Sequence, residues 1–116
     1  MRDFRNYKVW NDSIEFSLLI YKVSGNFPDE EKFGLVSQMR RAAVSVSSNI
    51  AEGCGRSSER EFSRFLEISL GSVFELRTQS LIAGQLNFIG HDQFQLIDSL
   101  VDQVSKQLNG LINKLK

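Results

Sequence analysis

The stretch that decides the fold is FQLIDSLVDQVSKQLNGLINKL, residues 94–115. Its apolar residues recur at alternating spacings of three and four: Phe94, Ile97, Val101, Val104, Leu108, Leu111 and Leu115. This heptad spacing places every member on one side of an α-helix. Because a helix with one such stripe buries it against other elements, the stretch predicts a helix in a helical core.

Three more segments with helical spacing precede it, and local signals mark their ends. Gly25 ends the first, and Pro28, which is followed by acidic residues, suits the first turn of the second. Ser58 and Glu61 fit a capping box for the third, and Asn87 is a good stop. The predicted helices cover residues 7–25, 29–53, 58–87 and 92–115.

These segments predict an all-α fold, an antiparallel up-down-up-down four-helix bundle that forms a single domain over residues 1–116. The connections are short, so neighbouring helices should run antiparallel. Residues 44–48 hold serines and β-branched valines, and a short strand competes there. The 3-4 spacing persists through them, which favours helix. In the connection between the second and third helices, Gly53 or Gly55 would supply the left-handed residue that ends the second helix.

Composition limits the classes of function. The chain has 14 basic and 14 acidic residues, and this zero net charge argues against a strong general attraction to nucleic acid or anionic membrane. A local basic patch remains open. Neither a secretory signal nor an apolar run long enough for a membrane span is visible, so we predict a cytoplasmic protein without a membrane partner.

Catalytic and cofactor motifs are not found, and we predict no enzyme, no cofactor and no metal. Cys54 and His91 are the only cysteine and histidine, which excludes an internal disulfide and a multi-ligand zinc site. They belong to different connections, so ordinary turn residues are favoured over a nucleophile pair. A di-iron bundle needs Glu-x-x-His on two helices, and one histidine cannot supply it.

The first and third helices carry more apolar residues than a monomeric bundle needs. Beside the stripe of Trp10, Ile14 and Leu18, the first helix has a second apolar stripe, formed by Val9, Phe16, Ile20 and Val23. Contiguous exposed apolar surface usually marks an interface, so we predict a homo-oligomer. The alternative is a monomer with a broad core. The predicted interface residues are Val9, Phe16, Ile20, Leu70, Phe74 and Arg77.

Arginines are the candidate binding residues. Arg56, Arg60 and Arg64 recur every four residues, so they line one edge of the third helix, and Arg40 and Arg41 lie in the second. Such a basic ridge would bind phosphates. The alternative is a solvated face of mixed sign, with acids nearby at positions 59, 61 and 67.

Two further features of the third helix and its approach stay open. Arg77 falls inside the apolar arc, where a guanidinium needs a partner. Glu52, Glu75 or an acid of another subunit would serve, and this ion pair is favoured over a binding role. The turn at residues 53–58 precedes a helix and would cradle an anion with backbone N–H groups, although such turns are common without ligands.

Several motifs resemble one known family. They are Gln38-Met39-Arg40-Arg41-Ala42-Ala43-Val44-Ser45, Ser48-Asn49-Ile50-Ala51-Glu52-Gly53, Gly55-Arg56 and Glu61-Phe62-Ser63-Arg64-Phe65-Leu66. The chain resembles the four-helix-bundle family of 23S rRNA intervening-sequence proteins from Val9 to Ile89. The resemblance implies an antiparallel four-helix bundle, a homopentamer and no enzymatic activity.

The accessory protein of diversity-generating retroelements is similar to this family, and it binds nucleic acid and a reverse transcriptase through positive charge. The resemblance therefore implies an accessory protein that binds the backbone of RNA or DNA, with a reverse transcriptase as a possible kind of protein partner. This neutral chain departs from those strongly basic relatives. Repetition of Arg56, Arg60 and Arg64 around a ring would compensate. The alternative function is a protein-interaction scaffold without a nucleic-acid ligand.

Overall fold

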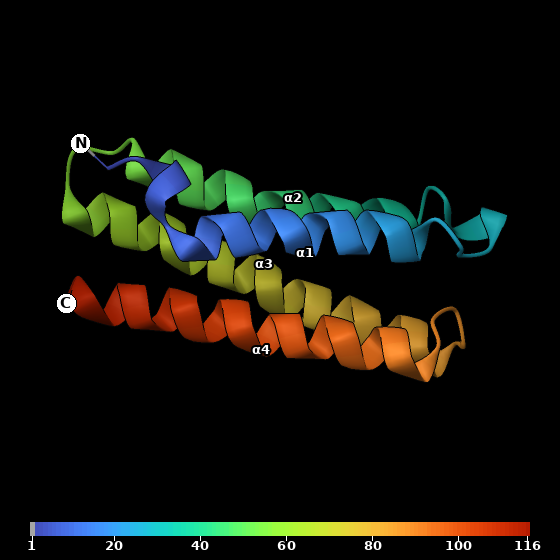
Figure 1. The fold of residues 1–116 in the computed structure, drawn as a ribbon. Coiled ribbons are helices and arrows are strands. Elements are labelled where there is room, and N and C mark those ends of the chain that lie inside the picture. Colours follow the sequence, from blue (N-terminus) through green and yellow to red (C-terminus); the bar gives the residue numbers. More distant parts are fainter. Residues whose placement is uncertain (1) are drawn as a thin grey trace.

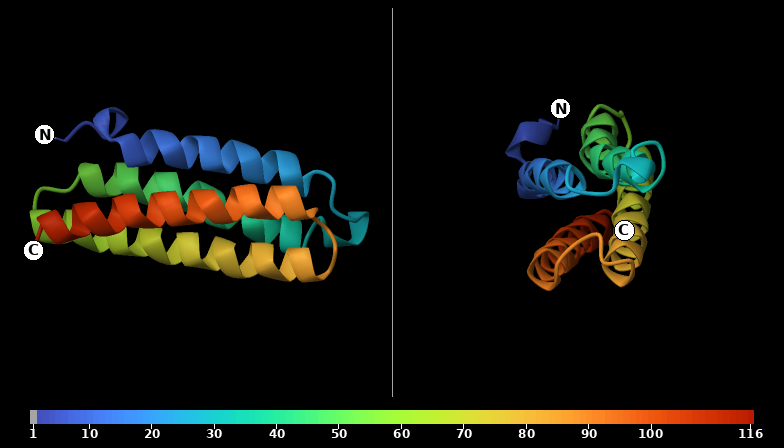
Figure 2. Two further views of the ribbon diagram at one scale, coloured as in Figure 1. Left: turned by 60° about the horizontal axis from the view of Figure 1, so that its bottom comes forward. Right: turned by 90° about the vertical axis from the view of Figure 1, so that its right-hand side faces the viewer.

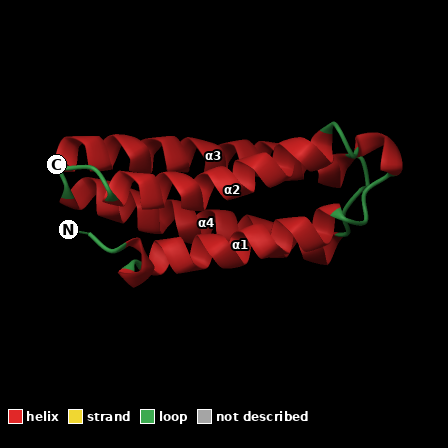
Figure 3. Ribbon diagram, turned by 90° about the horizontal axis from the view of Figure 1, so that it is seen from above, coloured by secondary structure: helices red, strands yellow, loops and turns green. Residues whose placement is uncertain are grey.

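Four long helices make up the fold, which a computed structural model describes over residues 2–116 (Figure 1). They are α1 (Lys8–Ser24), α2 (Leu35–Cys54), α3 (Glu59–Gln85) and α4 (His91–Lys114). Two short 3₁₀ helices, η1 (Phe4–Asn6) and η2 (Asp29–Glu31), precede α1 and α2. The described residues contain no strand, so residues 44–48 are helical, and the all-α fold class is confirmed (Figure 3).

The helices run up, down, up and down in a bundle of 43 × 23 × 19 Å. Seen end-on, α1 and α2 lie above α3 and α4 (Figure 2, right). Each helix packs against its two neighbours around the square, and α2 with α3 forms the most extensive contact. Both chain ends and the α2–α3 connection lie at one end of the bundle (Figure 1). None of the helices described is long and apolar enough to cross a membrane.

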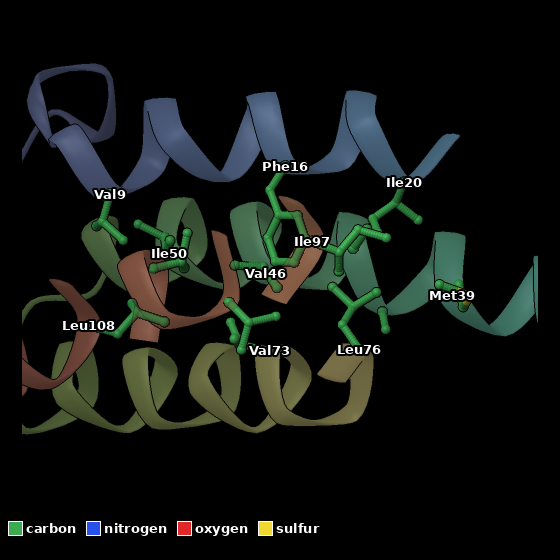
Figure 4. Close-up of a cluster of buried hydrophobic side chains, with 14 of the residues drawn as sticks. Val9, Phe16, Ile20, Met39, Val46, Ile50, Val73, Leu76, Ile97 and Leu108 are labelled. Atoms are coloured by element: carbon green, nitrogen blue, oxygen red, sulfur yellow. The ribbon is translucent and has the colours of Figure 1, made fainter. Parts of the chain in front are cut away.

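The core runs along the bundle axis and is filled by all four helices (Figure 4). The heptad of α4 supplies Ile97, Val101, Val104 and Leu108, as its spacing predicts. Opposite them, Val9, Phe16 and Ile20 point inward from α1. The prediction that these three lie at a subunit interface is wrong, because each is at most 4% exposed inside a single chain.

The two apolar stripes of α1 are therefore exchanged relative to the prediction. Leu18, in the predicted stripe with Trp10 and Ile14, is 61% exposed, and Tyr21, three residues further along the helix, is also exposed. Trp10 is half-buried, with its ring centroid 4.9 Å from that of Phe4 in η1. The surplus apolar surface exists, but it lies on the opposite side of α1.

Serines of α2 and α3 form hydrogen bonds across the tight contact between these two helices. Ser69 Oγ donates to the Val46 carbonyl at 2.8 Å, and the hydroxyls of Ser45 and Ser72 lie 2.9 Å apart. Small side chains let the two backbones approach closely while their hydroxyls stay hydrogen-bonded. This is how a serine-rich segment is accommodated as a buried helix.

Helix ends follow local signals in some places and not in others. Ser58 caps α3 by accepting from the Glu61 amide at 3.1 Å, and Asn87, with φ 62°, provides the left-handed residue after α3. Hydrogen bonds from Asn87 N to Gly84 O and from Phe88 N to Ala83 O complete a Schellman motif.

Two predicted starts are wrong. α2 begins at Leu35 rather than at residue 29. Residues 29–31 form the separate η2, and the non-helical backbone of Gly34 (φ −109°, ψ −109°) separates η2 from α2. α4 begins at His91, one residue before the predicted start, with Gly90 as its N-cap and Asp92 in its first turn.

Asp12 links α1 to α4 by hydrogen bonds. Its Oδ2 accepts from Lys8 Nζ at 2.7 Å, Gln107 Nε2 at 2.8 Å and Gln103 Nε2 at 2.9 Å. Burial by itself raises the pKa of this carboxyl, but the three donors together outweigh burial and hold the pKa below its usual value. The link therefore stabilises the fold at neutral pH and is lost as the pH falls through the pKa of folded Asp12.

Candidate nucleic-acid interface

Four arginines gather at the end of the bundle that holds both chain ends, and we call Arg2, Arg56, Arg60 and Arg64 the arginine cluster. Arg56 lies in the α2–α3 connection, and Arg60 and Arg64 follow on the first two turns of α3, as their spacing predicts. Arg2 joins them from the N-terminal segment, where its Nη1 donates to the Arg56 carbonyl at 2.8 Å.

Two phenylalanines form the floor of the arginine cluster. The Arg2 guanidinium lies 4.4 Å from the centroid of the Phe62 ring. Those of Arg56 and Arg64 lie 4.7 Å and 5.3 Å from the centroid of Phe65. Each cation–π contact of this kind contributes about 0.5–1 kcal/mol at exposed sites. The rings therefore hold three positive groups in place without neutralising them.

Acidic side chains offset part of this charge. Arg56 Nη2 is 3.0 Å from Glu52 Oε1, and Arg64 Nε is 3.4 Å from Glu61 Oε2. Both pairs are exposed and worth about 0–1 kcal/mol, so a phosphate can compete for these guanidinium groups. Within residues 2–116, Arg60 makes no ion pair. The surface is thus a basic ridge with acids beside it. It combines features of the phosphate-binding ridge and of the mixed-sign solvated face, the two interpretations of the sequence.

The other two candidate arginines lie elsewhere. Arg40 Nε donates to Ser24 Oγ at 2.9 Å, and its Nη2 donates to the Tyr21 carbonyl at 3.1 Å. Its guanidinium also lies 4.6 Å from the centroid of the Tyr21 ring. Arg40 therefore caps the C-terminal end of α1. Arg41 is exposed on the outer side of α2. Some 15 residues separate Arg41 from Arg56, roughly 20 Å along a helix, so the five arginines do not converge.

Arg77 has partners that the sequence does not indicate. Its guanidinium lies on the surface, 3.6 Å from Asp98 and 3.8 Å from Asp102 on α4, and it pairs with neither Glu52 nor Glu75. The side chain is 53% exposed, so its predicted place in the apolar arc is wrong. Arg77 instead joins α3 to α4 within one chain.

Replacement of Arg77 by methionine should change the free energy of unfolding by less than about 1 kcal/mol, because the ion pairs are long and exposed to water. Chemical unfolding followed by circular dichroism measures this. A loss several times larger would mean that Arg77 is the central support of the α3–α4 contact, contrary to its exposure.

The turn between α2 and α3 is used differently from the prediction. No described glycine has a positive φ, so neither Gly53 nor Gly55 supplies a left-handed residue. The Gly55 amide donates to Glu52 O and the Arg56 amide to Gly53 O, which removes two donors from any anion cradle. Gly53 belongs to α2 and is buried against α3.

Cys54 and His91 lie at opposite ends of the bundle, since Cys54 ends α2 beside the chain termini and His91 begins α4. Burial raises the pKa of the Cys54 thiol, although nearby Arg2 acts in the opposite direction. The two residues therefore cannot form a nucleophile pair within one chain. Of the remaining predicted interface residues, Leu70 is half-buried and Phe74 is exposed.

The fold and its surface define a compact antiparallel four-helix bundle with an arginine-rich end. Residues 5–110 match the model of the 23S rRNA-intervening sequence protein family, and the chain belongs to that family. A crystal structure of a protein of unknown function from the S23 ribosomal protein family of Bacteroides thetaiotaomicron has the same fold, with a TM-score of 0.84 and 24% identity. The similarity covers 90% of this chain and 95% of that one. No curated protein matches.

Proposed function

We propose that this protein is a non-enzymatic, self-associating accessory protein that binds the backbone of RNA or DNA through its arginine cluster. The observation that carries the proposal is the stacking of Arg2, Arg56 and Arg64 on Phe62 and Phe65. Guanidinium groups held in this way offer their N–H groups to phosphate oxygens at little further entropic cost.

Self-association would compensate for the zero net charge of the chain. One copy offers only a few phosphate contacts, and acids lie beside them. If copies pack side by side with parallel bundle axes, their arginine clusters gather at one end of the assembly, and weak contacts add through multivalency. A homopentamer is the assembly that we expect from the family resemblance.

Retention of a structured RNA by the purified protein tests the nucleic-acid part. We expect binding at about 50 mM salt that weakens steeply by about 200 mM, because each phosphate contact releases counterions. Arg60→Gln with Arg64→Gln should lower the slope of log affinity against log salt by roughly 2, about one unit for each lost contact. A DNA duplex of equal length tests whether RNA is preferred.

The matched control removes two charges elsewhere, by Lys22→Gln with Lys106→Gln, both exposed and outside the arginine cluster. The control should bind like the wild-type protein. Equal weakening in both double variants would show that only net charge matters. No retention at the lowest salt would exclude nucleic-acid binding.

A scaffold that binds only protein is the second candidate, and exposed apolar side chains on α1 and before α2 favour it. Leu18 and Phe33 are 61% and 89% exposed. This candidate gains support if the wild-type protein assembles but retains neither RNA nor DNA.

A further inference from the structure

A short segment before α1 lies across the end of the bundle that holds the arginine cluster. We call residues 2–7 the strap, which contains η1 and leads into α1. η1 packs against both α1 and α2. Within the strap, the Asp3 carboxylate caps η1 by accepting from the Arg5 amide at 3.1 Å. The strap therefore has a defined local structure although it is short.

The strap covers buried residues at this end of the bundle. The Arg2 guanidinium lies 4.4 Å from the centroid of the Phe62 ring, and the Tyr7 ring meets Phe62 edge-on with centroids 6.0 Å apart. Both Phe62 and Cys54 are only 1% exposed. Besides burial, which raises the pKa of the Cys54 thiol, Arg2 and Asp3 are the charged groups that influence this pKa. The strap thus lies over Phe62 and beside Cys54.

The strap itself is held by exposed contacts. None of the residues of η1 is buried, in contrast to the side chains beneath it. The Phe4 ring packs on half-buried Trp10, and Asn11 Nδ2 donates to the Arg5 and Tyr7 carbonyls at 3.0 Å in exposed hydrogen bonds. Segments with few buried contacts and exposed hydrogen bonds open at a much lower free energy than packed helices. Opening of the strap would uncover Cys54 while the four helices stay folded.

Closure of the strap brings Arg2 into the arginine cluster. The hydrogen bond from Arg2 Nη1 to the Arg56 carbonyl uses one of the five N–H donors of the guanidinium, so others remain for phosphate oxygens. Arg2 forms no ion pair in the part of the chain that the structure describes. Asp3, the one acid of the strap, is paired with Arg5 at 3.0 Å. The closed strap therefore adds positive charge to the cluster, and an open strap withdraws it.

We propose that the strap opens and closes as a unit, and that nucleic-acid backbone bound at the arginine cluster holds it closed through Arg2. This inference rests on the proposed function and adds a conformational step to it. A ligand that contacts Arg2 only in the closed state shifts the equilibrium toward that state. Cys54 carries the only thiol of the chain, so its reaction with iodoacetamide measures the open state.

Alkylation of Cys54 in the folded, full-length chain, followed by intact mass, tests the opening. The wild-type rate should change little at low urea concentrations, since a local opening exposes little surface. Phe4→Ala removes the ring contact with Trp10 and should speed alkylation roughly tenfold while circular dichroism stays helical. Phe33→Ala is the matched control, because Phe33 is 89% exposed near the start of α2, and this variant should react at the wild-type rate.

Addition of the structured RNA of the retention assay tests the coupling. At an RNA concentration about ten times its Kd, alkylation of the wild-type protein should slow about tenfold, as for a ligand that binds only the closed state. Arg2→Gln should react faster without RNA. It should still retain RNA through Arg60 and Arg64, yet gain no protection at about ten times its own Kd. Protection that persists in Arg2→Gln would mean that RNA shields Cys54 directly, which refutes the role of Arg2.

Further outcomes separate this inference from the proposed function. A wild-type rate that rises steeply with urea, in parallel with global unfolding, would show that the strap does not open by itself. A Phe4→Ala rate equal to that of the wild type would show that the strap does not protect Cys54. Equal rates with and without bound RNA refute the coupling while nucleic-acid binding stands. A strap that opens in a protein that retains no RNA keeps the conformational change but removes the proposed function and the coupling.

Discussion

Replacement of Phe16 by alanine is expected to lower the free energy of unfolding by about 3–5 kcal/mol. The ring is 1% exposed and points from the middle of α1 into the centre of the core, among residues of the other helices (Figure 4). Removing it deletes buried apolar surface and leaves a cavity that a packed bundle fills only in part. Denaturant unfolding monitored by circular dichroism measures the loss.

Leu18→Ala is the matched control, because Leu18 lies on the same helix but is 61% exposed. Its effect on the stability of the monomer should stay within about 0.5 kcal/mol. Under conditions where copies associate, Leu18→Ala should act on the mass of the assembly rather than on the fold. The reverse pattern, with Phe16→Ala folding normally but failing to assemble, would restore the interface that the sequence predicts.

The exchange of the two stripes on α1 shows what periodicity can and cannot determine. Apolar residues surround most of this helix, with Trp10, Ile14 and Leu18 on one side and Phe16 and Ile20 on the other. Spacing groups residues into faces, but it does not say which face meets α2 and α4. That choice depends on helix register and on the path of the connections, which are non-local properties.

α4 was predictable because it has one apolar stripe, and one stripe leaves a single choice of buried face. Features formed within a few residues were predictable too, such as the Ser58 cap and Asn87 as the stop after α3. The start of α2 was not, since Pro28 and the acids after it favour the first turn of any helix and instead begin the short η2.

The candidate site divides in the same way. The edge formed by Arg56, Arg60 and Arg64 is a local consequence of spacing and was predictable. Arg2 was missed because it reaches the cluster across 54 residues of sequence. The role of Arg40 at the end of α1 was missed because it depends on how α1 and α2 align.

Gly53→Ala is expected to lower the free energy of unfolding by about 1–3 kcal/mol, a typical cost of overpacking. A Cβ atom there would lie 2.8 Å from Phe65 Cβ and 3.1 Å from Phe62 Cδ1. Phe65 Cβ is fixed to the α3 backbone, so relief requires α2 and α3 to separate. Alanine favours helix over glycine by about 1 kcal/mol, and the clash must outweigh this gain.

Gly71→Ala isolates the helix-propensity effect, because a Cβ at Gly71 meets nothing within 4 Å. That variant should be more stable by about 0.5–1 kcal/mol, so unfolding curves of the two variants should shift in opposite directions. Gly53→Ala should also weaken RNA retention, since Phe62 and Phe65 carry the guanidiniums of Arg2, Arg56 and Arg64. A Gly53→Ala protein as stable as Gly71→Ala would show that α3 can move away freely. The close approach at Gly53 would then not be what positions the arginine cluster.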